Sequence, residues 1–198
     1  MKNALLLVDV QNDFTPGGAL GVPGGDEIVP IIDDYIDLAQ AARMIIIASR
    51  DWHPPETKHF RQWGGTWPPH CVQGTRGAEF RPDLRLPKDA WVVSKGMDPN
   101  EDAYSVFQAT APDGAPFKDL LQRLWVGRLF IGGLATDYCV LNSVIDAAAI
   151  GVQTTVLADA VRGINLAPGD IERAIAQMVA AGASLTVLNR FSHCLHTP

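Results

Sequence analysis

The chain has 198 residues, 47% of them hydrophobic and 19% charged, and its formal net charge is −6. This length fits a single domain over residues 1–198, and the composition is typical of a compact globular protein with a substantial core. The mild charge and the lack of any Lys/Arg cluster argue against nucleic acid and acidic membrane surfaces as partners.

The three cysteines, Cys71, Cys139 and Cys194, are odd in number and far apart. This pattern is no disulfide framework and indicates a reducing compartment. The first apolar run, residues 4–8, is too short for a signal peptide and ends at Asp9. No apolar stretch approaches the length of a membrane span. We therefore expect a cytoplasmic protein without a membrane partner.

Strand-like and helix-like segments alternate along the chain. Short apolar runs predict six strands, at residues 4–8, 44–48, 91–94, 129–131, 154–157 and 185–188. Apolar residues at helical spacing predict helices over residues 26–39, 117–125, 137–150 and 168–181. Asp26 is expected to cap the first helix, and Pro168 to lie in the first turn of the last. This alternation predicts a doubly wound α/β domain, with a mostly parallel six-stranded sheet and helices on both faces.

Two segments fall outside this alternation. A long loop over residues 51–88 has little periodicity, and loops of this length in compact domains are usually functional or disordered. Its three tryptophans argue against disorder. His193 and His196 lie near the C-terminus, where we expect a solvated tail.

Polar residues follow the predicted strands at their carboxyl ends, where ligands bind in doubly wound sheets. Asp9 ends the first strand, Asp51 the second and Lys95 the third. A segment with two adjacent glycines, residues 132–139, follows the fourth strand and ends at Cys139. We expect these residues to meet at one edge of the sheet.

His53, His59 and His70 lie close together in the long loop, and Asp51 stands two positions before the first of them. Imidazole and carboxylate groups are the ligands that zinc and similar divalent metals favour. In extended backbone, Asp51 and His53 project to the same side of the chain. A divalent metal site is one interpretation, and a polar, Pro-rich loop with scattered histidines is the other.

Cys139 lies in the first turn of a predicted helix, where free N–H groups and the helix dipole would lower the pKa of a thiol and could hold an oxyanion. Asp9 could accept the thiol proton if burial raises the pKa of its carboxyl. Lys95 could stabilise both charges as an ammonium. The alternatives are a buried, inert cysteine, a carboxylate that caps a turn, and a solvated lysine.

Five segments together resemble the nicotinamidase/pyrazinamidase group of the isochorismatase-like hydrolases. They are residues 9–14 (DVQNDF), 51–54 (DWHP), 67–72 (WPPHCV), 94–96 (SKG) and 133–140 (GLATDYCV). The resemblance spans nearly the whole chain, with the motifs in the family's order. The thiol distinguishes the chain from isochorismatases proper, and the WPPHC segment distinguishes it from metal-free cysteine amidases of this fold.

The resemblance implies a role for each matched residue. The catalytic triad corresponds to Asp9, Lys95 and Cys139. The metal ligands correspond to Asp51, His53 and His70, and His59 matches a further histidine ligand of some members. The backbone N–H groups of Ala135 and Cys139 correspond to the oxyanion hole, and the bond between Leu134 and Ala135 to one that is often cis. The implied metal is usually zinc, sometimes iron or manganese.

The implied reaction is the hydrolysis of nicotinamide, and of pyrazinamide, through a thioester on Cys139. Phe14, Trp67, Tyr104 and Leu134 are expected to contact the substrate, although aromatic residues are also ordinary core residues. Family members differ in oligomeric state, so a homo-oligomer is allowed. Three alternatives remain open: an amidohydrolase for another small amide, a metallohydrolase in which Cys139 is structural, and a catalytically silent binding module.

Overall fold

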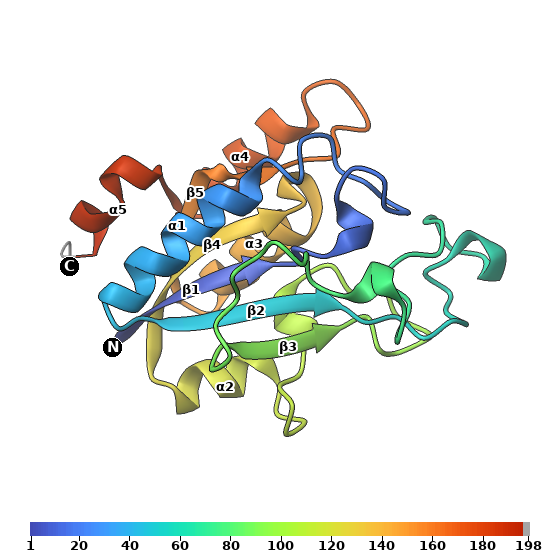
Figure 1. Ribbon diagram of the computed structural model, residues 1–198, viewed down its shortest axis with the longest axis horizontal. Helices are drawn as coiled ribbons and strands as arrows, with labels where there is room; N and C mark the ends of the chain where they lie inside the picture. Colours follow the sequence, from blue (N-terminus) through green and yellow to red (C-terminus); the bar gives the residue numbers. More distant parts are fainter. Residues whose placement is uncertain (196–198) are drawn as a thin grey trace.

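The computed structural model describes residues 1–195 and contains a six-stranded sheet with the order β3-β2-β1-β4-β5-β6 (Figure 1). Every neighbouring pair of these strands is parallel. The strands are β1 (Lys2–Val8), β2 (Ile45–Asp51), β3 (Trp91–Lys95), β4 (Val126–Leu134), β5 (Gln153–Arg162) and β6 (Ser184–Thr186). All six predicted strands are confirmed.

The strands β1 to β5 each run further than the apolar segments that predict them, whereas β6 ends at Thr186, two residues before its predicted end. The polar end of β2 pairs with β3, with Arg50 opposite Ser94 and Asp51 opposite Lys95. Backbone pairing with a neighbour thus extends a strand beyond the residues whose side chains are apolar. In the same way β4 and β5 continue past their predicted ends.

The helices cover both faces of the sheet (Figure 1), as the alternation of segments predicts. One core cluster joins α1 (Ile28–Ala41) and α5 (Leu188–Cys194) to β1 through side chains such as Leu5, Ile32 and Phe191. The other joins α2 (Phe117–Arg123), α3 (Leu141–Ala149) and α4 (Asp170–Ala180) to the opposite face through Leu6, Val144 and Met178. No helix in residues 1–195 is long and apolar enough to cross a membrane.

Several predicted helix ends are wrong. Glu27, not Asp26, is the N-cap of α1, and no side-chain hydrogen bond caps it. Pro168 precedes α4, because Gly169 is the N-cap and adopts a left-handed conformation. The helix predicted over residues 137–150 divides into a π-helix (Thr136–Val140) and α3.

The C-terminal region is more ordered than the sequence indicates. His193 is exposed but belongs to α5, a helix that the sequence analysis missed, and His196 lies outside the described residues. The long loop after β2 is also ordered, as its tryptophans predict. It contains two 3-10 helices (Arg61–Trp63 and Arg76–Ala78) and a bridge between Phe60 and Trp67.

Candidate active site and metal centre

The carboxyl ends of β1, β2, β3 and β4 lie along one edge of the sheet (Figure 1). Asp9 follows β1 directly and has a positive φ of 51°, a conformation that is uncommon for a residue other than glycine. Its N–H group donates to the Ser49 carbonyl at 3.2 Å, and its carboxylate accepts a hydrogen bond from the Ser49 hydroxyl at 2.7 Å. This backbone turn holds a fully buried carboxylate at the strand end.

The Lys95 ammonium lies at the centre of the site. It is 2.9 Å from Asp9 Oδ2, forms an ion pair with the Asp51 carboxylate, and donates to the sulfur of Cys139 at 3.4 Å and to the Ala103 carbonyl at 3.2 Å. Lys95 is fully buried, so the expectation of a solvated surface lysine is excluded. The structure brings together the three residues proposed from the sequence as the triad.

Burial and the Lys95 charge set the protonation of these groups. Burial raises the pKa of Asp9, although Lys95 opposes the shift, and this is the condition under which Asp9 can accept a proton. Burial alone would also raise the pKa of Asp51. The neighbouring Lys95, His53 and His70 outweigh this effect, so the pKa of the Asp51 carboxyl is well below its usual value. Lys95 itself stays charged, because Asp51 and Asp9 outweigh the burial that would lower its pKa.

The expected lowering of the Cys139 pKa is wrong. Burial raises the pKa of this thiol well above its ordinary value, and the opposing effect of the Lys95 ammonium is too small to reverse the shift. The nearby carboxylate of Asp9 raises it further. Cys139 is therefore a neutral thiol in the resting protein and needs a base before it can act as a nucleophile.

Cys139 lies in a π-helix that begins with hydrogen bonds from the Tyr138 and Val140 N–H groups to the Ala135 carbonyl, both at 3.1 Å. The Cys139 N–H lies between these two groups in the first turn, where N–H groups generally lack partners within a helix. π-helical turns occur frequently at functional sites. The Leu134–Ala135 peptide bond is cis, as the resemblance implies.

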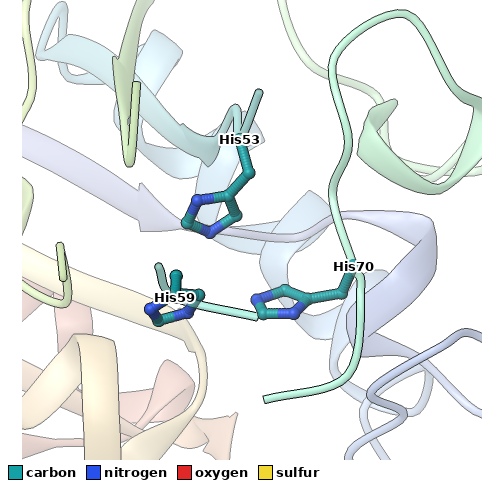
Figure 2. Close-up of side chains that lie close together, drawn as sticks. All are labelled: His53, His59 and His70. Atoms are coloured by element: carbon teal, nitrogen blue, oxygen red, sulfur yellow. The ribbon is translucent and has the colours of Figure 1, made fainter. Parts of the chain in front are cut away.

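Three buried imidazoles face a common space beside this triad (Figure 2). The ring centroid of His53 lies 4.6 Å from that of His59 and 5.1 Å from that of His70. One nitrogen atom of each ring lies within 4.8 Å of a nitrogen atom of each of the other two rings. The free Oδ2 of Asp51 is 3.5 Å from His53 Nε2 and 3.8 Å from His70 Nε2. Asp51 thus links the histidine cluster to Lys95.

The Nδ1 atom of each ring contacts an oxygen atom. The partners are the Gly96 carbonyl for His53 at 3.0 Å, the Pro68 carbonyl for His70 at 2.8 Å and the Asp102 carboxylate for His59. His53 Nε2 is buried and has no hydrogen-bond partner. A buried nitrogen without a partner, next to two further imidazoles and a carboxylate, fits a bound divalent metal ion.

A second group of possible ligands lies close by, formed by Asp9, Asp51 and Cys139. The ammonium of Lys95 contacts all three side chains. The positive charge that balances these groups is therefore supplied by the chain itself. The histidine cluster is the better candidate for a metal ion.

A small cavity of about 20 Å³ lies between the thiol and the histidines. Phe14, Trp67 and Tyr104 line it, as expected for residues that contact a substrate, whereas Leu134 does not and packs in the core beside α1. The sequence analysis missed three further lining residues, Leu20, Tyr138 and Ile164. Tyr138 could have been found from its place beside Cys139, but the other two lie in loops without any pattern.

The chain is similar to known proteins over most of its length. The sequence matches the isochorismatase domain over residues 3–189. It is 40% identical over 206 residues to a nicotinamidase of Escherichia coli (strain K12), covering 93% of this chain and 94% of the relative. It is 39% identical over 166 residues to a nicotinamidase/pyrazinamidase of Mycobacterium tuberculosis, covering 82% and 87%.

Solved structures of such proteins are also similar to this chain over most of its length. A pyrazinamidase of Pyrococcus horikoshii in complex with zinc has a TM-score of 0.86 and 43% identity, covering 94% of this chain and 99% of that one. The PnC1 protein of L. infantum in complex with nicotinate has a TM-score of 0.83 and 31% identity, covering 95% and 93%. The chain therefore belongs to the isochorismatase family, within its group of nicotinamidases and pyrazinamidases.

Proposed function

We propose that the protein hydrolyses nicotinamide to nicotinate and ammonia, and pyrazinamide to pyrazinoate. The observation that supports this most directly is the contact of one buried ammonium, Lys95, with the Asp9 carboxylate and the Cys139 sulfur. These are the parts of a cysteine amidohydrolase: a base, a nucleophile and a fixed positive charge. Relatives from Escherichia coli and Acinetobacter baylyi are nicotinamidases by name.

In this proposal Asp9 takes the proton from Cys139 Sγ, and the thiolate attacks the carboxamide carbon. The N–H groups of Ala135 and Cys139 hold the oxyanion. The C–N bond then breaks as Asp9 returns its proton to the departing nitrogen, which leaves as ammonia. Water attacks the resulting thioester while Asp9 accepts a proton from it, and this proton restores the thiol as the carboxylate is released.

Asp51, His53 and His70 are the proposed metal ligands, with His59 as a fourth. We propose zinc as the ion, with iron and manganese as alternatives, because imidazole and carboxylate donors suit all three. When held by these residues, the ion would supply Lewis acidity toward the ring nitrogen of the substrate and so would help to orient the ring. The residues of the chain then divide the work between the histidine cluster, which positions the ring, and the triad, which breaks the bond.

The test is ammonia release from nicotinamide by the zinc-loaded protein. Changing Cys139 to Ala should lower turnover to less than about one hundredth of wild type, since removing a nucleophile costs several orders of magnitude. The zinc content, by elemental analysis, should be unchanged. Cys194→Ala, which removes a thiol remote from the site, should leave turnover intact.

The same assay separates the alternatives. A metallohydrolase with a structural cysteine would remain active as Cys139→Ala. An enzyme for another small amide would release ammonia faster from that amide in a panel than from nicotinamide. A silent binding module would bind nicotinamide without releasing ammonia. The cytoplasmic location and the homo-oligomer remain predictions.

A further inference from the structure

The three histidines of the cluster differ in what holds their outer nitrogen. His53 and His70 each contact a backbone carbonyl, and these oxygens are fixed by the main chain. His59 instead contacts a side chain, the carboxylate of Asp102, which is 58% exposed. His59 is therefore the one ring of this cluster whose orienting partner can be changed without moving the backbone.

We propose that Asp102 is a positioning residue for the metal ion, because its carboxylate accepts the Nδ1 proton of His59 and so directs Nε2 into the histidine cluster. A neutral imidazole carries one proton, and the group that accepts it at Nδ1 decides which nitrogen keeps a free lone pair. A carboxylate in this place also makes the ring a stronger donor to a metal. The inference rests on the proposed role of His59 as a ligand.

Asp102 is held in place in spite of its exposure. Its own carbonyl accepts a hydrogen bond from Gln108 Nε2 at 2.9 Å, and Gln108 forms a capping box with Ser105 at the next 3-10 helix (Val106–Gln108). On the other side, the N–H of Lys58 donates to the Pro99 carbonyl at 2.8 Å. The loop that carries Asp102 is thus tied to the loop that carries His59, which keeps the backbones of the two residues close together.

The position of the imidazole proton makes this partner of His59 important. With the carboxylate at Nδ1, the other ring nitrogen is left with a free lone pair toward the cluster. Without the carboxylate, the ring could turn or carry its proton on Nε2, and either change removes the donor from the cluster.

The experiment measures the dissociation constant of Zn²⁺ from the metal-stripped protein, by competition with a chelator of known affinity. Asp102→Asn keeps the size of the side chain and removes its charge, and should weaken zinc binding about tenfold, the low end of what such outer partners contribute. Glu101→Gln is the matched control, because it removes the same charge from the adjacent exposed position. It should leave the dissociation constant unchanged.

A double-mutant cycle with His59→Ala shows whether the effect passes through the ring. Asp102→Asn should add no further loss of zinc affinity once His59 is gone. An unchanged dissociation constant for Asp102→Asn would overturn the proposal, and so would an equal loss in the presence and absence of His59. Ammonia release by the wild-type protein is scored separately, so failure of the nicotinamidase function would leave this comparison of affinities interpretable.

Discussion

At the scale of single residues, the site depends on one buried cation that compensates several acidic groups. Lys95 contacts two carboxylates and a thiol, and all four side chains are buried. The sequence identifies Lys95 because it lies at the end of a predicted strand, but this position alone does not show that its side chain is buried. The same burial explains why the thiol of Cys139 is neutral where the helix start alone suggests a thiolate.

This protonation state predicts the pH dependence of thiol alkylation in the substrate-free protein. A thiol reacts as its thiolate, which forms only above the pKa, so a raised pKa moves the rise in rate to higher pH. Alkylation of Cys139 by iodoacetamide should therefore be slow at neutral pH and still rising above about pH 9, beyond an ordinary thiol. Mass spectrometry of the labelled peptide gives the rate, with Cys139→Ala as the blank. A plateau reached below pH 7 would contradict the raised pKa.

Gly96 illustrates a backbone position on which a proposed metal ligand, His53, depends. It has a positive φ of 70°, and a methyl group added there would lie 2.4 Å from His53 Cε1. Gly96→Ala should displace the His53 ring and weaken zinc binding, in addition to the usual strain of about 1 kcal/mol for a side chain at positive φ.

Gly114→Ala is the matched control for this change. Gly114 has a similar φ of 82°, but a methyl group there would meet no atom within 4 Å. Both variants should lose a similar amount of free energy from backbone strain, and only Gly96→Ala should lose zinc affinity. Equal zinc affinities in the two variants, by chelator competition, would show that the contact with His53 is unimportant.

At the scale of secondary structure, a side chain continues the sheet where the backbone pairing of β1 with β2 stops. The last residues paired in register are Leu7 and Ala48, and one further backbone hydrogen bond joins the Asp9 N–H to the Ser49 carbonyl. Beyond them, the buried amide of Gln11 accepts from the Asp51 N–H at 2.8 Å and donates to the Asp51 carbonyl at 2.8 Å. Gln11 therefore fixes the backbone of the residue that joins Lys95 to the histidine cluster.

Replacing Gln11 with Met keeps the length of the side chain and removes both hydrogen bonds to Asp51, together with a third to the Ala78 carbonyl. The unpaired N–H and carbonyl of Asp51 should cost about 1–3 kcal/mol each in the free energy of unfolding, measured by urea denaturation, and zinc affinity should fall as Asp51 moves. Gln73→Met is the control, because Gln73 is exposed and donates to the Trp52 carbonyl at 2.8 Å. A variant of Gln11 as stable as that of Gln73 would refute the role.

The elements themselves were predicted better than their ends. Apolar runs locate every strand because strands buried on both faces need continuous apolar sequence. Helix starts depend on local geometry, and the π-helix before α3 and the cap of α1 leave no such pattern. The five segments that resemble the family contain the triad, His53 and His70, but they gave no role to Gln11. His59 and Asp102 lie outside them in loops.

At the scale of the whole molecule, strand order brings distant parts of the chain together. The chain moves from β1 to β2 and β3 on one side and then returns to place β4 on the other side of β1. Such a reversal opens a crevice at the carboxyl ends of the strands on either side of it. Asp9 follows β1 and Cys139 follows β4, so the proposed base and the proposed nucleophile meet at this point. Parallel pairing could be predicted from the sequence, but the order of the strands could not.

The triad and the histidine cluster lie on different parts of this edge, and in the proposed reaction a substrate contacts both. There the triad acts on a carboxamide, and a metal held by the histidine cluster would receive a ring nitrogen. Pyrazinamide keeps both groups in the arrangement of nicotinamide and should release ammonia at a comparable rate. Benzamide keeps only the carboxamide and should have a much lower kcat/KM.

A variant of the histidine cluster tests whether the ring nitrogen is the cause of this preference. His53→Ala removes the ring whose Nε2 is buried without a partner and should lower metal content. The remaining activity should then differ little between pyrazinamide and benzamide, because the loss of the metal removes the only proposed contact that distinguishes the two rings. If wild type hydrolysed benzamide as fast as pyrazinamide, or if His53→Ala kept the full preference, selection by the ring nitrogen would be wrong. The cavity walls formed by Phe14, Trp67 and Tyr104 would then have to account for specificity.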